Sequence, residues 1–297
     1  MRFSGHQTFV CRNGWLEKGV GLVKGDGRGF LADDVIVKLG VGKNMVESIK
    51  YWCQQTGLIE EDETAGTMRL TTLGEFLFGR DREEGVDPYL EDDASLWLLH
   101  YQIVAESPMS TWSLVFNDYN KPEFKKEDLT AFIVRKLQES GANVSEKTIE
   151  RDVDCFTRTH AGSKAKGEES FDSPFLGLHL LQGGTDAGLY RLNIGKKHNL
   201  PDALIGYATL KFMQSHSELS VSLPRLLFDP KSPGQVFKLD QAALVDAVLA
   251  LGEKDGGKLD YSDTAGLNIV QYRGDRDTLG RDADNYLRNC YETGDAG

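Results

Sequence analysis

The 297-residue sequence is long enough for two or three small domains. Hydrophobic residues make up 40% of it and charged residues 27%, which is typical of a globular protein and excludes a wholly disordered or fibrous chain. No apolar run approaches the roughly 18 residues of a membrane helix, so we expect no membrane partner. The first residues lack the apolar segment of a secretory signal and the four cysteines form no CxxC pair, so we expect a cytoplasmic protein.

The net charge of −12 is unevenly distributed along the sequence. Residues 1–56 contain eight Lys and Arg against five Asp and Glu, a local excess of +3. Residues 57–107 contain three against thirteen, a local value of −10. The first segment can therefore bind a polyanion, whereas the acidic remainder weakens non-specific association with one.

Residues 30–79 are predicted to form a winged helix-turn-helix. Apolar residues at helical spacing indicate one helix over 31–39 and a second over 44–56, with Gly57 as the stop signal of the second helix. Residues 58–71 indicate two strands around a polar tip, which would be the wing. The predicted DNA contacts on the second helix are Lys43, Asn44, Ser48 and Lys50.

A second pair of helices is predicted at 126–139 and 145–159. One face of the second helix carries Lys147, Arg151 and Arg158. These three residues are further predicted DNA contacts. The alternative is a structural repeat in which Arg151 is buried with a nearby aspartate at an interface.

The remaining sequence predicts short strands over 171–193 with a turn at Gly183-Gly184, three helices between 204 and 251, a hairpin over 258–272 and a closing helix. The expected fold is mostly α with small β-hairpins, an α+β class of winged helix-turn-helix units joined by helical segments. The expected parts are an N-terminal box at 1–29, a winged helix-turn-helix at 30–79, a helical region with a second helix-turn-helix-like unit at 80–170, and a C-terminal α+β winged-helix-like domain at 171–297. A charged loop at 161–170 is the expected linker.

Several passages resemble one family over nearly the whole chain. They are FSGHQTF at 3–9, RNGWL at 12–16, LGVGKNMV at 39–46, WLLH at 97–100, SEKTI at 145–149, RDVD at 151–154 and TAGL at 264–267. The sequence is similar here to the SspB-like family, an uncharacterised-domain family of bacterial DNA phosphorothioation and phage-defence islands.

The best-known member of that family is a nickase. The resemblance implies a DNA nickase (an endonuclease) that acts on double-stranded DNA with Mg²⁺ or Mn²⁺ as cofactor. The implied partners are the proteins that install sulfur, namely a cysteine desulfurase, an ATPase and a sulfur-transfer enzyme. A non-catalytic DNA-binding adaptor or regulator, a scaffold without DNA affinity, and a homodimer are left open.

The N-terminal box contains the candidate catalytic residues Ser4, His6 and Arg12. His6 can act as a general base or metal ligand, and Arg12 can hold a phosphate. The alternative is a terminal segment packed by aromatic residues, in which His6 makes a structural hydrogen bond. The sequence contains no recognised nuclease motif, and Asp152 and Asp154 fall on different helix faces, so metal ligands stay unassigned.

Overall fold

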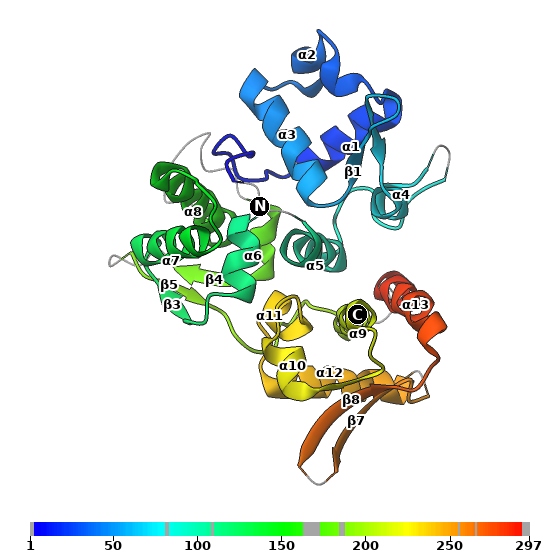
Figure 1. Ribbon diagram of the computed structural model, residues 1–297. Helices are drawn as coiled ribbons and strands as arrows, with labels where there is room; N and C mark the ends of the chain where they lie inside the picture. The colour runs from blue at the N-terminus through cyan, green and yellow to red at the C-terminus, as the bar shows by residue number, and fades with distance from the viewer. Residues whose placement is uncertain are drawn as a thin grey trace. The chain divides into compact units, whose positions relative to one another are not determined.

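The computed structural model describes residues 3–80, 83–107, 110–162, 173–183, 188–254, 256–264 and 266–292. They form two compact units, one of Met1–Val115 with Tyr119–Leu192 and the other of Phe116–Asp118 with Asn193–Gly297. Both units are mostly helical and carry small antiparallel sheets, which confirms the predicted α+β class (Figure 1). No helix in these ranges is long and apolar enough to cross a membrane.

The first unit begins with α1 (Trp15–Gly25), a helix that the sequence did not predict, and continues with two helices and a hairpin in the order predicted for residues 30–79. Gly40, with φ of 66°, makes the left-handed turn that ends the second helix, a conformation that glycine adopts without steric cost. The third helix buries Val46, Ile49 and Trp52 along one stripe, which gives it an inner and an outer face. The elements are α1 (Trp15–Gly25), α2 (Val35–Leu39), α3 (Lys43–Gln55), β1 (Ile59–Asp62), β2 (Thr67–Leu70) and α4 (Thr72–Phe78).

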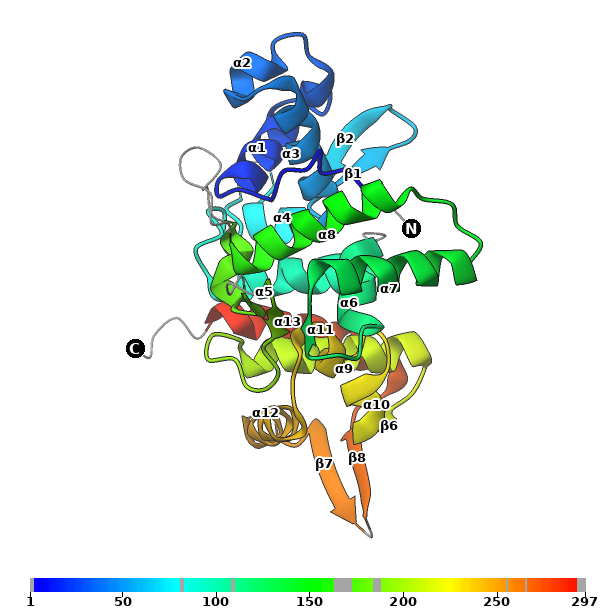
Figure 2. The same ribbon diagram turned by 90° about the vertical axis from the view of Figure 1, so that its left-hand side faces the viewer.

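The rest of the first unit is a set of packed helices beside a small sheet. Helix α5 (Asp93–Tyr101) is followed by the π-helical segment η2 (Gln102–Glu106) and by α6 (Ser110–Asn117), a helix that the sequence did not predict. Helices α7 (Lys126–Glu139) and α8 (Glu146–Ala161) lie side by side (Figure 2). Both helices agree with the sequence prediction to within two residues at each end.

The sheet of the first unit changes the predicted domain boundary. Strand β5 (Tyr190–Leu192) pairs with β3 (Glu123–Phe124) and with β4 (Leu181–Gly183), which follows η4 (Pro174–Leu178). Because this pairing joins residues far apart in sequence, 173–192 belong with the first unit rather than with the predicted domain at 171–297. The expected linker at 161–170 and the turn at Gly183-Gly184 lie largely outside the described residues.

The second unit is built around α9 (Asp202–His216), which packs against α12 (Gln241–Lys254) and α13 (Leu279–Glu292). Its sheet has the order β6-β8-β7, so the hairpin predicted over 258–272 gains a third strand. The core contains Leu204, Leu244 and Val270, none of which is exposed to solvent. The remaining elements are β6 (Ser220–Ser222), α10 (Leu223–Phe228), α11 (Pro233–Phe237), β7 (Leu259–Thr264), β8 (Leu267–Tyr272) and η5 (Arg276–Thr278).

Candidate functional site

The N-terminal box is held in the first unit through a fully buried histidine. His6 is 0% exposed, and its Nε2 lies 3.0 Å from Oδ1 of Asp152 on α8. The carbonyl of His6 accepts a hydrogen bond of 3.0 Å from the Ser48 hydroxyl on α3. His6 therefore joins the box to two helices, which is the structural alternative that the sequence left open.

Asp152 is the centre of this cluster. Besides facing His6, it accepts a 2.7 Å hydrogen bond from the Ser4 backbone amide on Oδ1 and one of 3.1 Å from the Thr111 hydroxyl on Oδ2. The Asp152 side chain is only 1% exposed, so it has lost its contacts with water. The hydrogen bonds from these donors compensate for that loss. Ser4 takes part in this cluster through its backbone amide.

The sequence contained a signal for Asp152 that was not used. Ile149, Val153 and Phe156 are spaced as one buried helix face, and Asp152 occupies the i+3 position of the same stripe. An acidic residue on the apolar face of a helix requires a buried partner. That partner, His6, is 146 residues away in sequence, so periodicity alone could not identify it.

The hydrogen bonds of His6 define its tautomer in this conformation. The Thr8 amide donates to Nδ1 over 3.1 Å, so the ring proton lies on Nε2 and points to Asp152. Burial lowers the pKa of His6, but Cys155 and the Asp152 carboxylate raise it by more, so the net shift is upward. A second proton on Nδ1 would have to displace the Thr8 amide, and protonation of His6 is therefore coupled to the shape of the box.

The box has an unusual backbone. Ser4, Gln7 and Thr8 have φ of 61°, 49° and 67°, a left-handed region that costs free energy for residues with a side chain. Gly5 passes so close to Tyr51 that an added Cβ would lie 2.2 Å from Cε2 of its ring. The strained segment persists because the contacts of His6 and Asp152 hold it, while the side chains of Gln7 and Thr8 remain exposed.

Arg12 and Arg158 both contact other residues of the first unit. The Arg12 guanidinium lies over the rings of Phe9 and Trp15, at 5.6 and 5.3 Å. Arg158 donates to the Thr8 carbonyl over 2.7 Å and to Asp154 over 2.8 Å. Arg158 therefore fixes the box, and these contacts occupy the side chain that was predicted to reach DNA.

The predicted DNA contacts on α3 divide into an outer and an inner set. Lys43 and Asn44 are exposed at the first turn of α3, which begins without a side-chain cap, and Lys50 is half-buried on the same helix. Ser48 is 0% exposed and bonded to the His6 carbonyl, so it cannot contact DNA in this conformation. On α8, Lys147 and Arg151 are exposed, so Arg151 is not buried within this chain.

The described residues do not provide a metal site of three or more protein ligands. No group of three His, Cys, Asp or Glu side chains in these ranges is placed to hold an ion. His6 and Asp152 are a pair whose atoms already satisfy one another and their neighbours. The described residues thus give no support for a Mg²⁺ or Mn²⁺ ion held by three such side chains.

Comparison with known proteins places the chain in a family. Two solved structures resemble it: "Magnesium ion-bound SspB crystal structure", with a TM-score of 0.86, and "SspB crystal structure", with 0.85. Each is 29% identical to this chain over 99% of it and 90% of the solved chain, which confirms the SspB-like resemblance. A search of curated proteins found no match. The family model described as protein of unknown function (DUF4007) matches residues 3–291, and this chain belongs to that family.

Proposed function

We propose that this protein binds double-stranded DNA as a component of a phosphorothioate modification or defence system. The observation that carries the proposal is the outer face of α3, where Lys43 and Asn44 are exposed at a helix start that has no side-chain cap. Backbone amides at such a start, together with a lysine, suit contact with a DNA phosphate. The relation to SspB supports the phosphorothioation context.

The element order around α3 also supports this proposal. Helix α2, a glycine turn, α3 and the β1–β2 hairpin follow one another as in a winged helix-turn-helix, in which the second helix of the motif enters the major groove. Lys50 extends the cationic side of α3, and Glu47 is the acidic residue on its exposed face. The excess of +3 in residues 1–56 favours this part of the chain as the contact with DNA.

The second unit has a similar order of elements but a different surface. Helices α9, α10 and α12 with strands β6, β7 and β8 follow the winged-helix order. The exposed residues of α12 are mostly uncharged or acidic: Gln241, Ala242, Asp246, Leu249, Glu253 and Lys254. Such a face repels a polyanion, so we assign the DNA contact to α3 and a structural or protein-binding role to α12.

Nicking of one DNA strand is the second candidate function, and the magnesium-bound SspB structure is the observation that favours it. In that case His6 and Asp152 are positioning residues, because both are buried and act by holding the strained box. The partners that would use the nick are a cysteine desulfurase, an ATPase and a sulfur-transfer enzyme. An adaptor that recruits these partners without cutting DNA has the same α3 surface and differs only in activity.

One experiment separates these functions. Pure full-length protein is incubated with supercoiled plasmid and either Mg²⁺ or Mn²⁺, and samples are analysed for retardation and for open circles. Retardation is the result that the proposal expects, and open circles in addition identify a nickase. A plasmid that is neither retarded nor nicked at low salt contradicts both functions and favours a scaffold.

A further inference from the structure

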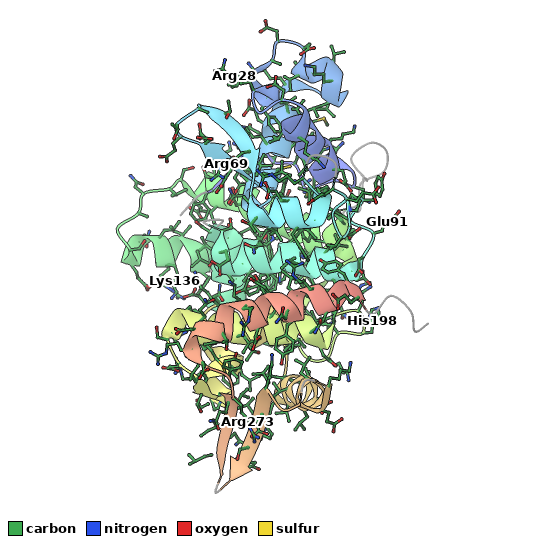
Figure 3. The ribbon with its side chains drawn as sticks, turned by 90° about the vertical axis from the view of Figure 1, so that its right-hand side faces the viewer. Arg28, Arg69, Glu91, Lys136, His198 and Arg273 are labelled. Atoms are coloured by element: carbon green, nitrogen blue, oxygen red, sulfur yellow. The ribbon has the colours of Figure 1, made fainter. Side chains whose placement is uncertain are left out.

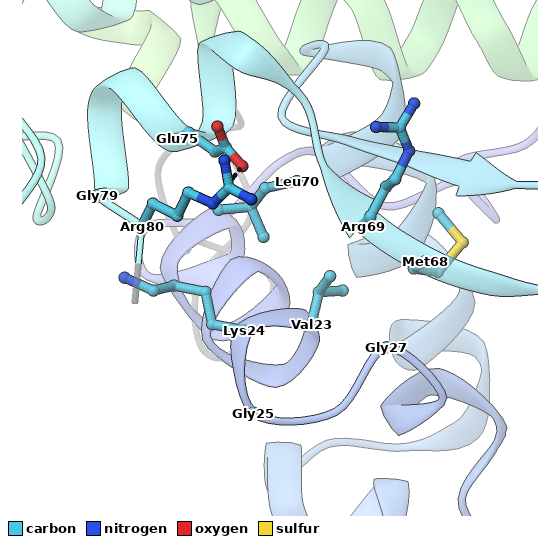
Figure 4. A pocket seen from close by; sticks show the side chains of 10 residues that line it. All are labelled: Val23, Lys24, Gly25, Gly27, Met68, Arg69, Leu70, Glu75, Gly79 and Arg80. Atoms are coloured by element: carbon cyan, nitrogen blue, oxygen red, sulfur yellow. Dashed lines mark ion pairs between the residues drawn. The ribbon is translucent and has the colours of Figure 1, made fainter. Parts of the chain in front are cut away.

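The first unit contains a hollow of about 420 Å³ between the end of α1, strand β2 and the end of α4 (Figure 4). Three cationic side chains line it, Lys24, Arg69 and Arg80, together with the single carboxylate of Glu75. This hollow is separate from the His6 cluster, and none of its residues belongs to the predicted DNA contacts. Its charge indicates the class of ligand it accepts.

Two of the cations are held within reach of the hollow by weak or incomplete contacts. Lys24 donates one hydrogen bond of 2.8 Å to the Phe78 carbonyl. An ammonium group has three N–H donors, so the others can bind a ligand in the hollow. Nε of Arg80 lies 3.5 Å from Oε1 of Glu75, and these side chains are 70% and 36% exposed. An exposed ion pair at this distance contributes little to stability, so the guanidinium can exchange it for a ligand.

Arg69 stands at the rim. It projects from β2 to the surface (Figure 3), and Figure 4 shows its guanidinium turned away from Lys24 and Arg80. It also pairs with Glu60 across the hairpin. Arg69 thus contributes long-range attraction, and the contacts with a ligand fall to Lys24 and Arg80.

The balance of side-chain charge in the hollow is positive. Three cations and one carboxylate line the hollow, and Glu60 pairs with Arg69 at its rim, so these side chains together carry 3 − 2 = +1. The C-terminal ends of α1 and α4 face the same region and oppose an anion with about half a charge each. Lys24 already offsets part of this effect, because it binds the last carbonyl of α4.

The wall of the hollow is partly backbone. A Cβ at Gly27 would lie 2.7 Å from the Met68 carbonyl, so the loop after α1 lies against β2 as closely as glycine allows. The Met68 amide in turn donates to the Gly27 carbonyl over 2.8 Å. This pairing holds the end of α1 against β2, and the bond to the Phe78 carbonyl holds Lys24 at the end of α4, so Lys24 is in place before a ligand arrives.

We propose that this hollow binds a phosphate group, with Lys24 and Arg80 as its charged ligands. A guanidinium matches the paired oxygens of a phosphate, and an ammonium group adds a point charge beside it. The site goes beyond the DNA contact proposed for α3, because the phosphate can belong either to the DNA backbone or to a small phosphorylated compound.

The test is a titration of the full-length protein with inorganic phosphate at low ionic strength, followed by NMR or calorimetry. Arg80→Gln weakens phosphate binding about fivefold, the size of one exposed charge contact. Glu75→Gln tightens it by a similar factor, because it removes the carboxylate that competes for Arg80. Lys121→Gln, an exposed lysine elsewhere in the first unit, leaves phosphate affinity unchanged and serves as the charge-matched control.

The two opposite shifts are both required. A loss in Arg80→Gln without a gain in Glu75→Gln, or no change in either, overturns the proposal. Titration of the same variants with duplex DNA then identifies the source: a parallel loss of DNA affinity in Arg80→Gln assigns the phosphate to DNA, and an unchanged DNA affinity assigns it to a small compound. If the native protein does not bind DNA, the α3 proposal fails while the phosphate titration still decides the hollow.

Discussion

Asp152 illustrates how a single residue can determine the shape of a segment far from it in sequence. The Ser4 amide, His6 and the Thr111 hydroxyl all direct polar atoms at its two oxygens. Removing the carboxylate leaves these groups buried without their acceptor, which costs more than the contacts themselves are worth. The box then loses the anchor that holds its left-handed residues.

We expect Asp152→Ala to lower the free energy of unfolding by about 3–5 kcal/mol, because three donors in the buried cluster, the Ser4 amide, His6 Nε2 and the Thr111 hydroxyl, lose their acceptor. Asp154→Ala is the matched control two residues away, where a half-exposed carboxylate pairs with Lys126 and Arg158, and it should cost about 1 kcal/mol or less. Urea denaturation of both variants provides the measurement. Equal losses would show that the His6 cluster contributes no more than a surface ion pair.

Two buried lysines in the second unit make its stability depend on pH. Burial lowers the pKa of Lys238 to about 8, and burial lowers the pKa of Lys197 to about 8 although Asp240 opposes this shift. Lys238 donates to the Phe116 carbonyl and to Gln235, two bonds that a neutral amine can still make. In the unfolded chain a lysine keeps its proton up to about pH 10.4.

The sign of the effect follows from the protons bound. Between about pH 8 and 10.4, Lys238 binds more protons in the unfolded state than in the folded state. The contribution of this lysine to the free energy of unfolding therefore increases as pH rises. Lys238→Met keeps the apolar stem and removes the titration. We expect the stability of the native protein relative to this variant to increase over that interval in paired denaturation curves. If the difference in the free energy of unfolding between the two proteins did not change with pH, the pKa of Lys238 would not be lowered in the folded state.

At the scale of elements, α8 has two functions along its length. Its first turns present Lys147 and Arg151 to solvent, and its later turns hold the box through Asp152 and Arg158. The sequence predicted one cationic face, since the three basic residues are helically aligned. The structure separates them because Arg158 finds acceptors in Thr8 and Asp154, contacts that helical spacing could not show.

Substitution of the two arginines tests this division. Arg151→Ala should change the free energy of unfolding by no more than about 0.5 kcal/mol, as expected for an exposed side chain. Arg158→Ala should lower it by about 1–2 kcal/mol, because a charged donor to the Thr8 carbonyl is lost. Thermal unfolding measures the stability of both variants, and DNA affinity is measured on the same samples. The assignment is contradicted if Arg151→Ala is the more destabilising change.

At the scale of the whole molecule, the sequence predicted local elements well and long-range pairing poorly. Helix α7 and the β1–β2 hairpin follow from periodicity and turn residues, which are local properties. The sequence did not predict helix α6, because Trp112, Leu114, Val115 and Phe116 are buried all round it and leave no amphipathic period. The β3–β5 pairing that moves the domain boundary also has no local signal.

The candidate site shows the same division between local and long-range information. Lys43, which is exposed, and Lys50, which is half-buried, were identified from helical spacing, whereas Ser48 was placed on the same polar side and is buried by the box. His6 was among the candidate catalytic residues, but its buried partner could be found only in three dimensions. Contacts separated by more than 100 residues therefore hold Ser4 and His6 against Asp152.

The most direct test of the account is the salt dependence of duplex DNA binding by Lys43→Glu combined with Lys50→Glu. Neither side chain is part of the core, so the variant should fold, which circular dichroism checks. Fluorescence anisotropy should show weaker binding and a slope of log K against log salt that is flatter by about 0.9 per lost contact, or about 2 in total. Lys121→Glu, matched to each substitution in charge, should leave the slope unchanged. An unchanged affinity and slope in the double variant would contradict the assignment of α3 to DNA.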